Sequence, residues 1–211
     1  MMEKVNPHIP QWVIIVCLLF FNFILYANTL FNGFVSDDIA AIVQNPDIGR
    51  TSVYINPFDP QPSQILNSLI YNIVGLSPWL YHLNNLIWHI LNTLLVFALI
   101  NWLGAGVLFA TLTSSLFAIH PIHTEPVNWI SGLPYLLYSC FSLMTLFLVV
   151  GVDRRKLKKW WLFLIPITAT LAFVSSEKSL VLPLIVLILS KRSYILFSAA
   201  DGSSDISSVS S

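Results

Sequence analysis

Long apolar runs separated by short polar segments dominate the chain. About 20 apolar residues are needed for a helix to cross a bilayer, so the pattern predicts about six transmembrane helices. The predicted spans are residues 12–30, 81–102, 103–119, 127–150, 160–174 and 179–190. The last two are short, because a 15-residue helix rises only about 22 Å against a hydrocarbon core of about 30 Å. A re-entrant hairpin over residues 160–190 is therefore an alternative to two crossings.

The longest polar connection, residues 31–80, follows the first predicted span. Its many prolines indicate that much of it is irregular. Within it, the stretch SQILNSLIYNIVGL has apolar residues at helical spacing, which predicts an amphipathic helix lying along the membrane interface. Ser63 is the predicted N-cap of this helix, and Gly75 is its predicted end.

Composition supports a membrane protein. Of the 211 residues, 56% are hydrophobic and 9% are charged, whereas soluble domains have roughly 25% charged residues. The net charge is zero, so nothing indicates a nucleic-acid partner. The predicted organisation is a cytoplasmic N-terminus over residues 1–10, an all-α polytopic membrane domain over residues 11–192, and a small polar tail over residues 193–211 that is expected to be disordered.

Basic residues predict the orientation. Lys and Arg concentrate on the cytoplasmic side of membrane proteins, and the segment DRRKLKKWW lies after the fourth predicted span. With six spans, this segment, the N-terminus and the basic pair after residue 190 all face the cytoplasm. Only Arg50 and Lys178 then lie outside. The re-entrant alternative keeps the same basic clusters inside, so charge does not exclude it.

The same topology brings carboxylates to the outer face. Asp37 and Asp38 lie in the first outer loop, Glu125 follows the third span, and Glu177 follows the fifth. Ionisable groups at membrane depth are costly and usually functional. Three separate connections thus predict one polar site on the non-cytoplasmic side.

The adjacent pair Asp37 and Asp38 allows three interpretations. Two neighbouring carboxylates can raise the pKa of one of them and create a base. They can also bind a divalent cation through oxygen ligands. The third interpretation is an exposed loop in which one of them caps a helix.

The motif HPIHTE places His120, His123 and Glu125 within one turn. Its order differs from the HExxH helix of zinc proteases, in which the glutamate lies between the histidines. One interpretation is that these residues line a cavity; another is that they cap the third span and form local hydrogen bonds. Binding of a divalent cation is a further open interpretation. Its candidate ligands are Asp37, Asp38, His120, His123 and Glu125.

A polar stripe marks the start of the second predicted span. His82, Asn85, His89 and Asn92 follow 3-4-3 spacing, so they share one helix face that is expected to pack inward. Two roles stay open for this helix face: it packs against other helices for structural reasons, or it lines a cavity that binds substrate. Glu177 adjoins Lys178, so a local ion pair is the alternative to a role in the site.

Four of these segments together resemble a known family, the N-terminal membrane half of the TMTC-like proteins. These are polytopic glycosyltransferases of the GT-C type that often carry tetratricopeptide repeats. The segments are GFVSDDIAAIVQNPDI, GLSPWLYHLNNLIWHILNTLLVF, LFAIHPIHTEPVNWISG and SSEKSLVLPL. The resemblance implies a GT-C-like fold and a polyprenyl-phosphate sugar as donor. It also implies transfer of mannose to Ser or Thr hydroxyls of a protein acceptor, with Asp37 as the base and Asp38 as its neighbour or a cation ligand.

The chain departs from that family at three places. Members commonly have arginine where this chain has Gln61, and Gly-Arg-x-Asp where it has Gly132-Leu133-Pro134-Tyr135. The third departure is the absence of the later spans and the repeats that are expected in the family. These departures favour an alternative, a non-catalytic truncated or degenerate membrane subunit that binds lipid or a partner protein. A second subunit that supplies further helices is a related expectation.

Overall fold

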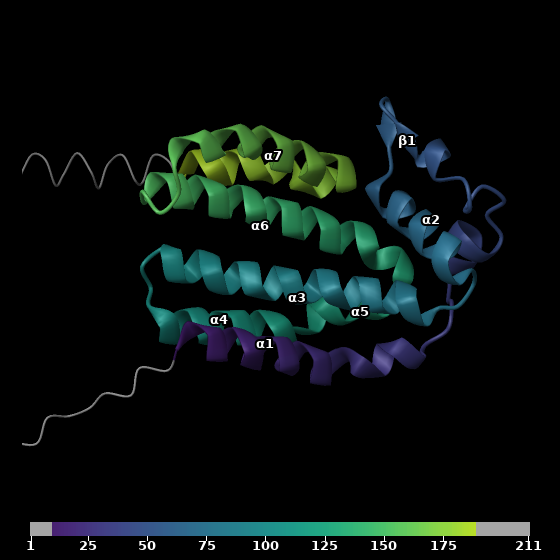
Figure 1. Ribbon diagram of the computed structural model, residues 1–211, viewed down its shortest axis with the longest axis horizontal. Coiled ribbons are helices and arrows are strands. Elements are labelled where there is room, and N and C mark those ends of the chain that lie inside the picture. Colours follow the sequence, from purple (N-terminus) through teal and green to yellow (C-terminus); the bar gives the residue numbers. More distant parts are fainter. Residues whose placement is uncertain (1–9, 189–211) are drawn as a thin grey trace, which may run out of the picture.

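The computed structural model describes residues 10–188, and these form a helical bundle (Figure 1). Its longer helices are α1 (Gln11–Tyr26), α2 (Pro62–Val74), α3 (Trp79–Trp102), α4 (Val107–Ile119), α6 (Leu133–Asp153) and α7 (Leu164–Ser175), and residues 182–188 are also helical. The predicted tail and most of the predicted N-terminal segment lie outside the described residues.

Short turns of helix connect the longer helices. They are η1 (Ala27–Phe31), η2 (Ile39–Val43), η3 (Thr51–Tyr54), η4 (Pro121–His123), α5 (Thr124–Asn128), η5 (Ile130–Gly132), η6 (Lys159–Phe163) and η7 (Glu177–Val181). Two-residue strands β1 (Ile55–Asn56) and β2 (Asp59–Pro60) pair antiparallel, with Ile55 opposite Pro60. The all-helical prediction is therefore confirmed apart from this small hairpin.

Three helical segments are long and apolar enough to cross a membrane. They are Gln11–Phe31, Trp79–Trp102 and Ile130–Asp153. A fourth arises if Val107–Ile119 and Pro121–Asn128, which meet at a bend of 51°, count as one span. Lys159–Ser175 is apolar but shorter. The described residues thus form three or four candidate spans of an integral membrane protein, and the count of six remains a prediction.

The boundaries of two predicted spans differ from the observed helices. Residues 103–106 were expected to be helical, but Gly104 and Gly106 adopt positive φ angles and separate α3 from α4. The span predicted from residue 127 is interrupted at Trp129, whose backbone is extended, so α6 begins only at Leu133. Apolar composition alone shows neither break, because both depend on backbone conformation.

Helix α3 occupies the centre of the bundle. It contacts α1 and α4 on one side and α6 on the other, and α7 packs against the far side of α6 (Figure 1). Buried apolar side chains from α1, α3 and α4 meet in one cluster around Leu18, Phe97 and Ala110. A second cluster, around Tyr26, Leu86, Val127 and Leu136, lies where α1 and α3 contact the turn before α6.

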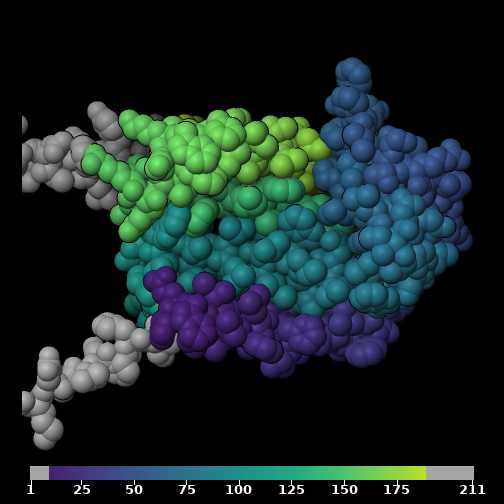
Figure 2. All heavy atoms as spheres, viewed as in Figure 1, coloured from purple at the N-terminus to yellow at the C-terminus, as the bar shows by residue number. Residues whose placement is uncertain are grey.

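The predicted outer loop forms a cap over one end of this bundle, with the β1–β2 hairpin projecting from it (Figure 2). A cluster that includes Ile42, Ile70, Tyr81 and Ile130 attaches the cap to the helices. Helix α2 lies within the cap, where a helix was predicted, and Gly75 ends it with a positive φ of 62°. The N-cap predicted at Ser63 was wrong by two positions, because Gln61 is the N-cap residue and the helix begins at Pro62.

Candidate functional site

Asp38 connects the cap to the helical bundle. The side chain is fully buried, and its Oδ1 accepts hydrogen bonds from the Ser131 backbone N–H at 2.8 Å and from the Ser131 hydroxyl at 2.6 Å. Its Oδ2 accepts a third bond from the Val35 N–H at 3.1 Å. A buried carboxylate is costly unless it is hydrogen-bonded, so these three donors make Asp38 an anchor between segments 93 residues apart.

Asp37 has the opposite environment. Its side chain is exposed and accepts a long hydrogen bond of 3.4 Å from the Ser36 hydroxyl. Ser36 has a φ of 51°, which is uncommon for a residue other than glycine. The two adjacent carboxylates therefore lie in different surroundings, and of the two only that of Asp37 is exposed.

Asn85 fixes the turn between α4 and α6. Its buried amide nitrogen lies within hydrogen-bonding distance of three carbonyl oxygens, those of Pro126, Trp129 and Ile130, at 3.1, 2.9 and 3.4 Å. Gly132 permits this close packing, because an added Cβ would lie only 2.6 Å from the Cα of Pro126. The turn that carries the HPIHTE motif is therefore held rigidly against α3.

The other residues of the polar stripe are also buried. His82 shares a hydrogen bond of 3.1 Å with the hydroxyl of Thr29. The Nε2 atom of His89 lies 3.3 Å from the Ala118 carbonyl oxygen, and its ring packs edge-on against Tyr26. The prediction that this helix face packs inward is confirmed, and the contacts of His82, Asn85 and His89 are made to neighbouring helices and turns.

The HPIHTE motif forms the turn η4 and the start of α5, outside the long helices. His120 and Glu125 are exposed, and the Nδ1 of His120 accepts a hydrogen bond from the Ile122 N–H at 3.2 Å. His123 is half-buried, and its ring centre lies 5.3 Å from that of His89. Burial, and secondarily the nearby His120, hold the pKa of His123 below its usual value, so its imidazole is neutral near pH 7.

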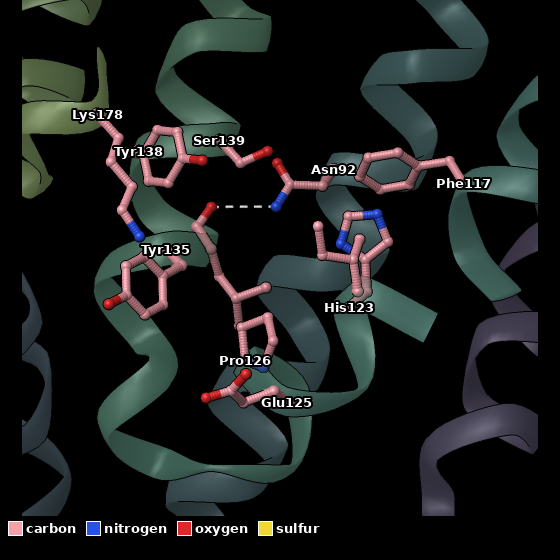
Figure 3. Close-up of a pocket in the computed structure, with 11 residues that line it drawn as sticks. Asn92, Phe117, His123, Glu125, Pro126, Tyr135, Tyr138, Ser139 and Lys178 are labelled. Carbon is pink, nitrogen blue, oxygen red and sulfur yellow. Dashed lines mark hydrogen bonds between the residues drawn. The ribbon is translucent and has the colours of Figure 1, made fainter. Parts of the chain in front are cut away.

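A pocket of about 400 Å³ opens beside this turn (Figure 3). It is bounded by α3, α6, the motif turn and the η7 turn. The lining residues include Asn92, His123, Glu125, Tyr135 and Lys178. The ammonium of Lys178 lies 4.0 Å from the centre of the Tyr135 ring. The turn after α4 thus contributes the Glu125 carboxylate to this pocket, and the turn after α7 contributes the Lys178 ammonium.

The structure does not gather every predicted site residue. Neither Asp37 nor Glu177 lines the pocket, and Glu177 is an exposed residue at the start of η7. Over residues 10–188, no group of three or more His, Cys, Asp or Glu side chains is placed to hold a metal ion. Within those residues, the five candidate ligands named from the sequence are therefore not brought together as a metal site.

Three residues of the site were not selected from the sequence. Ser131 holds Asp38, Tyr135 lies beneath the Lys178 ammonium, and Lys178 points into the pocket. An ion pair between Lys178 and Glu177 was the alternative to a role of Glu177 in the site, but these two neighbours form no ion pair in the described chain.

Comparison with known proteins gives relatives of one kind. The chain is 34% identical to human "Protein O-mannosyl-transferase TMTC3" over 135 residues, which cover 56% of this chain and 15% of the relative. It is 32% identical to Drosophila melanogaster "Protein O-mannosyl-transferase Tmtc1" over 156 residues, covering 66% and 18%. Drosophila melanogaster "Protein O-mannosyl-transferase Tmtc2" is 33% identical over 128 residues, covering 52% and 14%.

The matched region spans less than a fifth of the length of these relatives. No family model matches the chain, and no solved structure matches it. The relatives nevertheless belong to the same family as the motif resemblance indicates. Over half to two-thirds of its length, this chain is homologous to the N-terminal membrane region of the TMTC protein O-mannosyl-transferases.

Proposed function

We propose that this chain is a GT-C-like membrane glycosyltransferase, or the part of one that carries the base. It transfers a sugar, mannose by analogy with the names of its relatives, from a polyprenyl-phosphate donor to a Ser or Thr hydroxyl of a protein. The donor's lipid tail lies in the bilayer, and transfer takes place at the non-cytoplasmic face.

The different environments of Asp37 and Asp38 carry this proposal. A general base needs a carboxylate that can reach a substrate proton. Asp38 is buried and accepts hydrogen bonds from Ser131 and Val35, whereas Asp37 is exposed. Asp38 therefore positions the loop, and Asp37 is the residue of the pair that can contact an acceptor.

The reaction follows from these roles. The acceptor oxygen forms a bond to the anomeric carbon of the sugar as the bond from that carbon to the phosphate oxygen breaks. Asp37 takes the proton of the acceptor hydroxyl, and polyprenyl phosphate leaves as an anion. Proton removal by a positioned side chain contributes typically 10²- to 10⁴-fold to such a step.

The topology proposed for this function has six crossings. Helices α1, α3, α4, α6, α7 and the helix that includes residues 182–188 run in alternating directions along the bundle (Figure 1). The cap and the motif turn then share the non-cytoplasmic side. Two exposed apolar residues on one face of α2, Leu69 and Ile73, and the exposed Leu76 just after the helix support its placement along the interface.

The test compares Asp37→Asn with Asp38→Asn in the full chain. Asp37→Asn should lower transfer from polyprenyl-phosphate mannose to an acceptor peptide at least 100-fold, while thermal unfolding in detergent stays unchanged. Asp38→Asn should lower the unfolding temperature, because the amide nitrogen must face either the donors of Ser131 or the Val35 N–H. Full transfer by the Asp37→Asn variant would reject the assignment.

A second candidate function is a non-catalytic membrane subunit that binds lipid or a partner protein. The observation that favours it is Leu133, which is completely buried at a position where the resembling proteins commonly have arginine. This candidate predicts that the wild-type chain binds donor lipid or partner but transfers no sugar, and that Asp37→Asn changes neither property.

A further inference from the structure

The pocket beside the motif turn has an asymmetric set of charges. Of the described residues that line it, Lys178 is the one Lys or Arg and Glu125 the one carboxylate. His123 adds an imidazole that is neutral near pH 7, since burial depresses its pKa. The remaining lining is aromatic, apolar or neutral polar. A ligand with one anionic group would find a single attractive point, the Lys178 ammonium.

The backbone fixes the direction of Lys178. Ser176 caps the η7 turn, and its hydroxyl accepts a hydrogen bond from the Lys178 N–H at 3.3 Å. The side chain then extends toward α6, where its ammonium lies 4.0 Å from the centre of the Tyr135 ring (Figure 3). A cation held over an aromatic face is stabilised there and keeps its N–H groups for a ligand.

The opposite part of the pocket offers hydrogen-bond acceptors. Asn92 donates through its amide nitrogen to the Leu136 carbonyl oxygen at 3.0 Å, but its buried Oδ1 has no partner in the described chain. Buried polar atoms without partners are rare and require an explanation. The exposed carboxylate of Glu125 is a second acceptor on the pocket wall. Both are suited to the hydroxyl groups of a sugar.

We propose that this pocket binds the phosphate-sugar head group of a polyprenyl-phosphate sugar. Lys178 contacts the phosphate, Asn92 and Glu125 accept hydrogen bonds from sugar hydroxyls, and Tyr135 holds the ammonium in place. The identity of the lipid rests on the proposed function. The volume of about 400 Å³ lies within the range of about 300–1,000 Å³ that is usual for small-ligand sites.

The experiment measures donor binding rather than transfer. The full chain in phosphatidylcholine nanodiscs is titrated with a short-chain polyprenyl-phosphate mannose, and bound lipid is counted by native mass spectrometry. Lys178→Gln should weaken binding about 10- to 100-fold, as expected for loss of a charged hydrogen bond. Lys178→Arg should retain most of the binding, and Glu125→Gln should reduce the preference for mannosylated over sugar-free polyprenyl phosphate.

The matched control is Lys156→Gln, which removes an exposed lysine from the turn after α6, at the opposite end of the bundle. It should bind the donor as the wild type does. Equal losses in Lys156→Gln and Lys178→Gln would overturn the proposal, because they would indicate general charge attraction. Competition by inorganic phosphate or by phosphatidylserine at the donor's own concentrations would overturn it as well.

The outcomes separate this inference from the proposed function. If the wild type and Lys178→Gln bind the donor equally, the pocket assignment fails while the role of Asp37 is unaffected. If Asp37→Asn binds the donor normally and still transfers mannose, the catalytic assignment fails while the pocket assignment stands. Thermal unfolding of Lys178→Gln should match the wild type, since the side chain is exposed.

Discussion

The polar stripe of α3 and the motif turn after α4 contain similar residues in opposite environments. His82, Asn85 and His89 on α3 are completely buried, and each has a hydrogen-bond partner on another element. His120 and Glu125 in the turn are exposed, and the hydrogen bond that His120 accepts from the Ile122 N–H is local. Residue type therefore does not separate structural from chemical roles here. Burial and the nature of the partner separate them.

The largest effect is expected where the two regions touch, at Gly132. Gly132→Ala places a Cβ 2.6 Å from the Pro126 Cα, which is backbone and cannot move aside. We expect a loss of about 1–3 kcal/mol in the free energy of unfolding, typical of overpacking. Denaturation by sodium dodecyl sulfate in mixed micelles measures this loss.

Gly33→Ala is the control, because no atom lies within 4 Å of its added Cβ. Equal stabilities would contradict the close packing.

A smaller loss is expected at Asn85. Asn85→Ala removes the amide that lies against the Pro126, Trp129 and Ile130 carbonyl oxygens. Hydrogen bonds between helices in membranes contribute about 0.6 kcal/mol on average and up to about 1.7 kcal/mol, and we expect a value near the upper end. The same micelle titration checks it. The neighbouring Asn84→Ala is a matched control, because the buried Asn84 amide nitrogen has no hydrogen-bond partner among residues 10–188. Asn84→Ala should not reduce stability, and a larger effect there than at Asn85 would reverse the comparison.

The smallest effect on stability is expected in the exposed turn. His120→Ala should leave the unfolding temperature unchanged, because surface substitutions away from special features have small effects. His89→Ala should lower it, since the substitution leaves a cavity between Tyr26 and Phe117. Differential scanning fluorimetry in detergent compares the two directly. A larger loss for His120→Ala would show that the turn, like the stripe, is structural.

Much of the helical arrangement could be predicted from the sequence because it follows from apolar length. The runs around α1, α3 and α6 are long enough to cross a bilayer, and the positions of the helices follow them. The inward face of α3 was also predictable, since 3-4-3 spacing places His82, Asn85, His89 and Asn92 on one side. The boundary at Gly104 was not, because only the folded backbone shows which glycines adopt positive φ.

The site was less predictable, because its contacts join distant segments. The sequence predicted one polar site formed by carboxylates from three connections. The structure places Glu125 and Lys178 in one pocket, whereas neither Asp37 nor Glu177 lines it. The sequence offered no means of distinguishing Asp37 from Asp38. That distinction depends on Ser131, 93 residues away from Asp38.

The sequence by itself determined that this is a helical membrane protein, because apolar run length follows directly from the thickness of a bilayer. It also determined which polar segments were available for chemistry. Only the tertiary structure decided what each polar group does. Asp38 became an anchor and Lys178 a pocket cation because burial and partner geometry are properties of residues brought together from different helices.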